Sequence, residues 1–299
     1  MHIPDLIQVL LGGIAMGSIY TLMGKGLLVT YLTTRALNFG QGDFLMIGSF
    51  MAMAMLLAGV PVYLMVPLVV ATMAVLGFAL ERAAIRPLER LPAGAASALA
   101  WILTTMGFGM VLQNAAQLIW GKSRYYSPQL FASEKGETLS VWGVRFFLEE
   151  VVVAVVALSV VALLYWMLFR TRWGKQVAAV SFDKGTAQLL GINVRRVVVS
   201  SYVMMACLAG VSGILAGPLT TVNSHMGIMF LLKGFAAVCI GGFANPIGVL
   251  IAGLGFGVIE AFSGFIDSSY GDVYPFLIAF VLLVARPTGL FGESHTQVR

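Results

Sequence analysis

The sequence predicts an all-α polytopic membrane protein with about eight or nine transmembrane or half-spanning helices. Of its 299 residues, 59% are hydrophobic and only 10% are charged, whereas a soluble domain carries about 25% charged residues. Apolar runs that approach or exceed the roughly 20 residues needed to cross a bilayer recur along the chain. We therefore expect residues 1–299 to form a single transmembrane domain.

The apolar runs give the expected helices in chain order. The first run has no basic leader region before it, which favours a transmembrane helix over a removed signal peptide. The windows at 44–58 and 273–285 are short for a full crossing and fit half-helices or tilted helices equally well. The expected windows are 6–32, 44–58, 61–80, 96–120, 147–168, 197–219, 226–243, 246–266 and 273–285.

Glycines spaced four residues apart occur inside these windows, at 13–17, 213–217 and 253–257. Small residues at this spacing let helix backbones approach closely within a membrane, so they predict tight packing inside the bundle. The run at 253–257 does not indicate a nucleotide site, because it lies in a membrane window with no strand before it.

Basic residues predict how the chain is oriented in the membrane. Segments 81–90 and 169–196 together carry nine basic residues, whereas segment 121–146 carries four, which Glu134 and Glu137 partly offset. Placing the first two segments in the cytoplasm leaves twelve basic residues inside, four outside, and Lys25 and Lys233 within spans. The excess of basic residues in cytoplasmic loops then puts the N-terminus outside and the C-terminus in the cytoplasm. No basic run has interleaved aromatics, so no nucleic-acid partner is expected.

The sequence shows no catalytic constellation and no metal-ligand spacing. His2, His225 and His295 are isolated, and no nucleophile, base and orienting group converge. Cys207 and Cys239 lie in apolar stretches, where cysteine behaves as a small hydrophobic residue. We therefore expect no enzyme activity, no catalytic residue and no metal site.

Polar residues at membrane depth are the main functional candidates, because such residues are costly there and usually face a pathway or a packed interior. The stretch ALNFGQGDFLMIGSF at 36–50 places three polar residues around two helix-breaking glycines, between two apolar windows. We expect a helix break at Gly40 and Gly42, and a second around 241–246. Asp43 could also cap the helix that follows, since an acid is favourable there. The candidate pathway residues are Asn38, Gln41, Asp43 and Lys233.

Three charged residues within the membrane windows, Lys25, Lys233 and Glu260, need separate interpretations. Lys25 could extend toward the cytoplasmic interface or face a pathway, and the sequence leaves both open. Lys233 lies nearer the middle of its window, which favours an ion pair or a pathway role. For Glu260 we expect a structural role in a buried network.

The segment 169–196 is too long for a tight turn. Residues 176–190 have a mixed apolar and polar pattern that predicts one short helix ending near Gly191. Asp183 and Lys184 are expected to face water or a partner. The helix could lie on the lipid surface, or it could be a docking element for a cytoplasmic protein.

Four stretches, in this order, resemble the permease subunits of branched-chain amino acid ABC importers. The first is GSIYTLMGKGLLVTYLTTRALNFGQGDFLMIGSF at 17–50, and RTRWGKQVAAVSFDKGTAQLLGIN at 170–193 is similar to the family's ATPase-coupling loop. LKGFAAVCIGGFANPIGVLIAGLGFGVIEA at 232–261 and RPTGLFGE at 286–293 follow. The polar LNFGQGDF is more similar to the shorter of the two paralogous permeases.

The resemblance implies an ABC importer permease fold in a bacterial inner membrane, working by alternating access. It implies a paralogous second permease, two cytoplasmic ATPase subunits and an external solute-binding protein as partners. ATP and Mg²⁺ would be bound by the ATPase subunits, with no cofactor on this chain. The segment 169–196 would contain the coupling contacts, carried over to Ala178, Asp183, Lys184, Ala187, Leu190 and Gly191.

The chain departs from the family pattern at two places. Lys25 stands where a small apolar residue is expected, and Gly40-Gln41-Gly42 replaces Ala-His-Gly. The cargo therefore stays open between branched-chain or related amino acids and another small polar solute such as urea, an aromatic acid or a sugar. An ion-coupled secondary transporter is the alternative from another class. It would need midplane acids, and Glu260 is the only intramembrane acid well clear of a span end.

Overall fold

A computed structural model describes residues 3–89, 98–130, 138–141, 144–243, 245–267, 270–286 and 289–291. Nine apolar helices make up most of this part of the chain. They are α1 (Ile3–Thr34), α2 (Gln41–Leu57), α3 (Val62–Leu80), α5 (Ala98–Trp120), α6 (Leu148–Arg170), α9 (Val194–Ala216), α10 (Met226–Gly241), α11 (Pro246–Ile266) and α12 (Val273–Ala285).

These helices confirm the predicted fold class. Within the described residues, six helical stretches are long and apolar enough to cross a membrane. The shorter apolar helices are α2, α10 and α12, of 17, 16 and 13 residues. Each of the nine predicted windows corresponds to one of the nine helices. A five-residue π-turn η1 (Glu81–Ile85) and the short α4 (Arg86–Glu89) extend α3.

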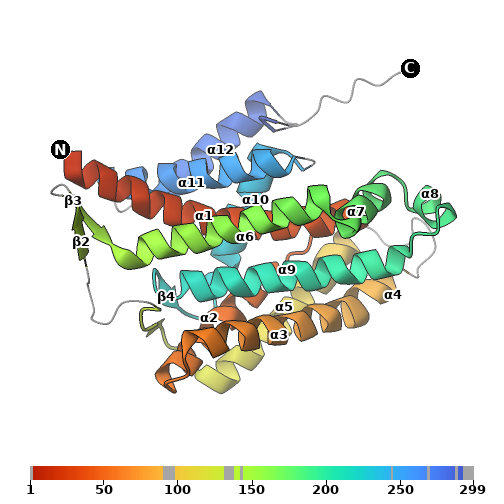
Figure 1. Ribbon diagram of the computed structural model, residues 1–299, viewed down its shortest axis with the longest axis horizontal. Coiled ribbons are helices and arrows are strands. Elements are labelled where there is room, and N and C mark those ends of the chain that lie inside the picture. The colour runs from red at the N-terminus through yellow and green to blue at the C-terminus, as the bar shows by residue number, and fades with distance from the viewer. Residues whose placement is uncertain are drawn as a thin grey trace.

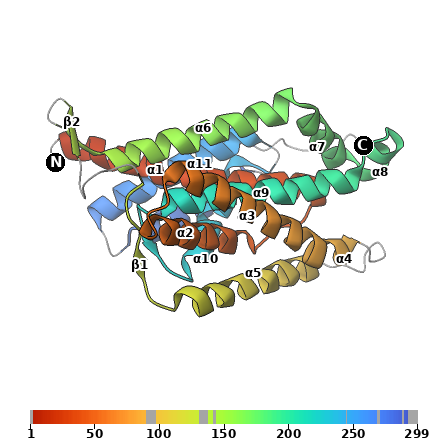
Figure 2. The ribbon, with the colours of Figure 1, turned by 60° about the horizontal axis from the view of Figure 1, so that its bottom comes forward.

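Helix α1 runs through the centre of the bundle and packs against α6, α9, α10 and α11 (Figures 1 and 2). Its closest neighbour is α11, because glycines on both helices remove the side chains between them. A methyl group added at Gly257 would lie 2.3 Å from the Gly17 backbone nitrogen, and one added at Gly13 would lie 2.8 Å from Val258 Cα. The glycine spacing at 13–17 and 253–257 therefore serves packing within this chain, as predicted.

Two short antiparallel sheets, which the all-α expectation did not include, lie near the N-terminal end of the bundle (Figure 1). Strand β1 (Tyr125–Tyr126) pairs with β4 (Thr221–Val222) and ties the segment after α5 to the segment after α9. Strand β2 (Thr138–Val141) pairs with β3 (Val144–Phe147), with Thr138 opposite Phe147.

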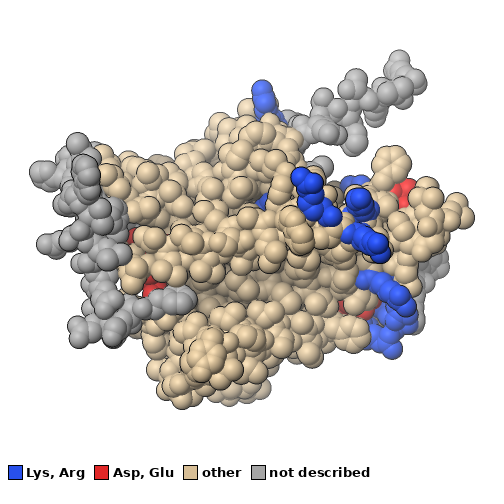
Figure 3. All heavy atoms as spheres, viewed as in Figure 1, with Lys and Arg blue, Asp and Glu red and all other residues tan. Residues whose placement is uncertain are grey.

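The opposite end of the bundle is basic. It carries α4 and two helices of the segment between α6 and α9, namely α7 (Arg172–Phe182) and α8 (Lys184–Leu189). Figure 3 shows most of the Lys and Arg side chains of the visible face gathered over this end, with another apart from them at the top of the view. Arg90, Lys135 and Arg299, which entered the charge count, lie outside the described residues.

Candidate translocation pathway and coupling surface

The predicted break between the first two helices is present at residues 35–40. Helix α1 ends at Thr34, and Arg35 turns the chain with a φ of 57°. Its guanidinium donates to the Ser181 carbonyl of α7 at 2.5 Å. The chain then returns beside α5, where the Phe39 N–H donates to Thr105 Oγ1 at 3.2 Å. The break therefore connects the basic end to the interior of the bundle.

Asn38 and Gln41 are both fully buried and hold this break together. Asn38 Oδ1 accepts the Gly40 N–H at 3.0 Å, which closes a local turn. Gln41 Nε2 donates to the Met23 carbonyl of α1 at 2.7 Å. Gln41 Oε1 is buried and has no partner among the described residues. The two side chains face packed helices rather than an open cavity.

Helices α2 and α10 begin at the same place inside the bundle. A methyl group added at Gly42 would lie 2.2 Å from the Gly227 carbonyl oxygen, and one added at Gly227 would lie 2.4 Å from the Gly42 carbonyl oxygen. Only glycine permits this approach. Because helix N-termini carry a partial positive charge, their meeting creates a region that favours an anionic group.

Asp43 lies beside this meeting point, half-buried against Gly109 of α5. Its carboxylate has no hydrogen-bond or ion-pair partner among the described residues. The expectation that Asp43 could cap α2 is wrong, because the N-cap position is Gly40 and no side chain caps the helix. The charge of Asp43 in the first turn remains favourable toward the helix dipole. Of the four candidate pathway residues, Asp43 is the one whose carboxylate has no hydrogen-bond or ion-pair partner within the part of the chain that the structure describes.

Lys25 does not extend to the interface. Its side chain is only 1% exposed, and Nζ donates to the Pro246 carbonyl at the start of α11, at 2.8 Å. The interpretation in which Lys25 reaches the lipid interface is therefore excluded. The ammonium instead ties α1 to the predicted break between Gly241 and Pro246, which the structure also contains.

Lys233 is the centre of a polar network that joins four helices or helix ends. Its Nζ lies 2.8 Å from Glu260 Oε1 of α11 and 2.8 Å from Asp272 Oδ1, which precedes α12. It also donates to the Tyr20 hydroxyl of α1 at 3.3 Å, and that hydroxyl donates to Glu260 Oε1 at 3.1 Å. The expected structural role of Glu260 in a network is confirmed.

The same network borders a cavity of about 360 Å³ toward the N-terminal end of the bundle. Glu260, Asp272 and Glu150 line this cavity, and the ammonium of Lys233 neutralises part of their charge. Lys233 thus forms the ion pair that the sequence favoured, and its two carboxylate partners line a polar cavity.

The segment between α6 and α9 forms two helices, not the single one predicted. Asp183 has an extended backbone (φ −155°, ψ 122°) that ends α7 and begins α8. Its Oδ1 accepts the Thr186 N–H at 2.5 Å, so the carboxylate caps α8. Asp183 is also exposed, in agreement with the expectation that it faces water or a partner. Hydrogen bonds from Thr186 hold the pKa of the Asp183 carboxyl below its ordinary value of 3.8. Gly191 has a φ of 80°, as expected of a glycine that follows a helix.

Helices α7 and α8 have one face that packs against α9 and another that is exposed. Val177, Val180 and Ala187 are buried and pack on Val197 of α9. At the tip, Phe182 is 91% exposed and Leu189 is 90% exposed. Among the residues carried over from the family, Ala178, Leu190 and Gly191 are exposed, Lys184 is half-buried and Ala187 is buried.

The fold, with six helices long and apolar enough to cross a membrane among the described residues and a basic end, defines a multi-pass membrane protein. The family described as branched-chain amino acid transport system / permease component matches residues 9–285, and the chain belongs to this family. The resemblance found in the sequence is thereby confirmed. The family is one of membrane transport permeases and not of enzymes.

Individual relatives match along nearly the whole chain. BraD, a high-affinity branched-chain amino acid transport system permease protein of Pseudomonas aeruginosa, is 30% identical over 99% of this chain and 99% of its own. LivH of Escherichia coli K12, with the same description, is 28% identical over 97% of each. A galactose/methyl galactoside import permease, MglC of Haemophilus influenzae, is 32% identical over only 39% of this chain and 34% of its own.

Proposed function

We propose that this chain is the membrane-spanning permease subunit of an ATP-driven importer for branched-chain or closely related small amino acids. The observation that carries this proposal is the family match over residues 9–285, with relatives that align end to end. The galactose permease aligns over about a third of its length, which disfavours a sugar as the cargo.

The protein would lie in a bacterial inner membrane with its basic end in the cytoplasm. The excess of Lys and Arg around α4, α7 and α8 supports this orientation. The N-terminus and the strand pairs then face outward, where an external solute-binding protein would deliver the cargo. A second, paralogous permease would complete the membrane part.

Two ATPase subunits, which would bind ATP and Mg²⁺, would dock on α7 and α8. The exposed Phe182 and Leu189 supply an apolar contact, and large exposed apolar side chains outside the membrane mark interaction sites. Movement of α7 would reach the interior through the hydrogen bond between Arg35 and Ser181. Since Arg35 begins the break at 35–40, closure of the ATPases would shift the start of α2.

The start of α2 would contact the cargo during alternating access. Asp43 offers a carboxylate for the ammonium group of an amino acid, while the N-termini of α2 and α10 favour its carboxylate. No covalent chemistry is required, because ligand-favoured states need only shift a conformational equilibrium. Asn38 and Gln41 would keep the break in place, and Lys233 would stabilise the outer side.

An ion-coupled secondary transporter is disfavoured by the state of Glu260. The carboxylate that would have to bind the coupling ion is paired with Lys233 at 2.8 Å. The docking surface on α7 and α8 would also have no use in a transporter that works alone.

Uptake by the complete transporter tests the proposal. The permease would be reconstituted with its partner permease, ATPases and binding protein, and uptake of labelled leucine, isoleucine and valine would be measured. ATP-dependent uptake is expected, with none when ATP is omitted. ATP-dependent uptake of urea or an aromatic acid alone would replace the cargo assignment, and uptake driven by an ion gradient without ATP would overturn the importer assignment.

A further inference from the structure

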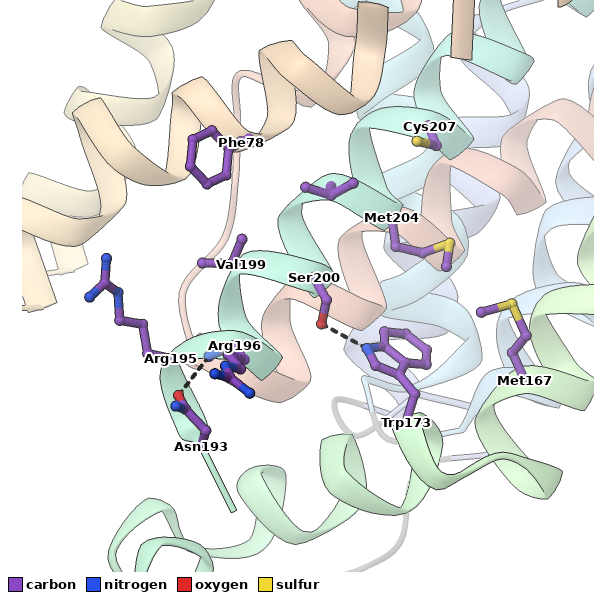
Figure 4. A pocket seen from close by; sticks show the side chains of 11 residues that line it. Phe78, Met167, Trp173, Asn193, Arg195, Arg196, Val199, Ser200, Met204 and Cys207 are labelled. Carbon is purple, nitrogen blue, oxygen red and sulfur yellow. Dashed lines mark hydrogen bonds between the residues drawn. The ribbon is translucent and has the colours of Figure 1, made fainter. Parts of the chain in front are cut away.

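A cavity of about 800 Å³ lies between α3, α6, α7 and α9, near the basic end of the bundle (Figure 4). One face of α9 forms the floor of the cavity. The α9 residues that line it recur every three or four positions over about 16 Å of helix length. These residues are Arg196, Val199, Ser200, Val203, Met204 and Cys207.

The cavity opens to the outside of the bundle. Phe78 of α3 and Met167 of α6 form opposite walls, and Trp173 of α7 closes the basic end (Figure 4). Phe78 is 50% exposed, and the outer faces of α3 and α6 carry further exposed apolar side chains. The Trp173 indole N–H donates to Ser200 Oγ at 2.7 Å, so both polar groups are satisfied within the protein. Away from the arginines, the lining is therefore apolar.

The basic end of the cavity has positive charge without a matching acid. Arg195 and Arg196 lie in the first turn of α9, which contains no acidic residue, and Asn193 caps that turn. No described residue that lines the cavity is acidic. Two guanidinium groups at the positive end of a helix are unfavourable unless an anion lies nearby. Arg195 also lines a neighbouring cavity that contains Glu81, so Arg196 is the more specific of the two.

We propose that this cavity holds one anionic phospholipid of the cytoplasmic leaflet. Its phosphate would lie at Arg196 and Arg195, and an acyl chain would run along α9 toward Cys207. The apolar floor of about 16 Å matches the depth of one leaflet, which is about half of the roughly 30 Å hydrocarbon core. Guanidinium groups bind phosphate with paired hydrogen bonds, and tryptophan is typical of the level of the headgroups.

A phospholipid fits this site better than a partner helix does. The charge is confined to one end and the rest of the cavity is apolar, which is the distribution that a phospholipid complements along its length. The site lies on the outside of the bundle, away from Asp43 and from the tip of α7 and α8, so it is independent of the cargo.

Lipid retention by the full transporter tests the proposal. The complex would be exchanged into nanodiscs of equal parts phosphatidylcholine and phosphatidylglycerol, purified, and examined by native mass spectrometry. We expect one phosphatidylglycerol retained per copy of this chain in preference to phosphatidylcholine. Arg196→Gln should lower that retention about fivefold, and Arg195→Gln with Arg196→Gln further, because each cation near an anionic lipid contributes about that factor.

A control variant and a second site variant separate this site from general charge. Lys175→Gln with Arg286→Gln removes two positive charges from exposed positions that do not line the cavity, and it should leave retention within twofold. Val203→Phe fills the middle of the cavity without changing charge, and it should lower retention at least fivefold. Melting curves would confirm that each variant is folded. If the variant that lacks both Arg195 and Arg196 does not assemble, the two single variants Val203→Phe and Arg196→Gln are enough to test the proposal.

Three results would overturn the proposal. Equal retention of phosphatidylglycerol and phosphatidylcholine would show that the arginines do not select an anionic lipid. Loss in the arginine variants without loss in Val203→Phe would indicate attraction of the bilayer surface and no seated lipid. A helix of a partner chain found in the cavity of the assembled transporter would show that protein occupies it.

Discussion

Lys233 of α10 and Glu260 of α11 form an ion pair with 2.8 Å between Nζ and Oε1, 27 residues apart in the sequence. The Tyr20 hydroxyl of α1 contacts both groups, so three helices meet at this pair. Charged groups at membrane depth are stable only when such partners are present, and the pair therefore fixes the positions of α10 and α11 relative to α1.

Replacing Lys233 should destabilise the protein more than replacing Glu260. Lys233→Met leaves two carboxylates without their cation and should lower the free energy of unfolding by about 2 kcal/mol. This is less than the loss expected when a fully buried ion pair is broken, because Asp272 is largely exposed. Glu260→Gln leaves Lys233 paired with Asp272 and should have a smaller effect. Thermal unfolding in detergent measures both, and equal effects would contradict the asymmetry.

The packing of α1 against α11 predicts a contrast between two nearby glycines. Gly257→Ala should lower the free energy of unfolding by about 1–3 kcal/mol, because the added methyl would lie 2.3 Å from the Gly17 nitrogen. Gly255→Ala is the matched control, since a methyl there has open space, and it should be neutral or slightly stabilising. Similar melting temperatures for the two variants would show that the helices are not in close contact.

The cap at Asp183 predicts that α8 depends on one side chain. Asp183→Ala should raise amide hydrogen exchange in residues 184–190 roughly fivefold, the usual factor for a lost N-cap, whereas Asp183→Asn should retain protection. Exchange followed by mass spectrometry measures both variants. An unchanged rate in the alanine variant would mean that packing alone holds α8.

The same cap has a predictable pH dependence. Its hydrogen bonds lower the pKa of the folded-state carboxyl relative to the ordinary 3.8. Stability from the cap is therefore complete above that ordinary value and is lost only as the pH falls through the lowered pKa. Protection of residues 184–190 should be constant between pH 6 and pH 5 once intrinsic exchange rates are corrected, and a decline within that range would contradict the assignment.

The apolar tip of α7 and α8 predicts where the ATPase subunits bind. Phe182→Ser with Leu189→Ser should reduce co-purification of the ATPases at least tenfold, because two large exposed side chains would no longer be buried on binding. The melting temperature of the permease alone should not change. The control is Leu64→Ser, which replaces an exposed apolar residue near the start of α3, at the end of the bundle opposite α7 and α8. This variant should bind the ATPases normally. Full binding by the tip variant would move the docking surface elsewhere.

The sequence predicts the helices well because length and hydropathy determine them locally. The nine windows, the breaks near Gly40 and Gly241, and the close packing through 13–17 and 253–257 all follow from composition and spacing. The two-residue strands β1 and β4 are too short to leave a pattern. The helix boundary at Asp183 could have been found, since an aspartate three residues before Thr186 is a common N-cap signal.

The contacts of the candidate site are harder to predict from the sequence, because they join segments that lie far apart in the chain. Arg35 and Ser181 are 146 residues apart, and Lys25 and Pro246 are 221 residues apart. Asn38, Gln41 and Asp43 look alike in the sequence as polar residues at one break. Only the fold separates the two that hydrogen-bond within the packed interior from Asp43, whose carboxylate has no described partner.

Asp43 should be required for transport but not for folding. Asp43→Asn keeps the shape of the side chain and removes the charge that would pair with the ammonium of an amino acid, and charge-assisted hydrogen bonds are about twice as strong as neutral ones. We expect uptake by the reconstituted transporter to fall at least tenfold, with the melting temperature and ATPase co-purification unchanged. Asp5→Asn, an exposed acid in the first turn of α1, is the control and should transport normally. Normal uptake by Asp43→Asn would place the pathway away from the meeting of α2 and α10. A loss of uptake accompanied by a loss of assembly would assign Asp43 to packing instead.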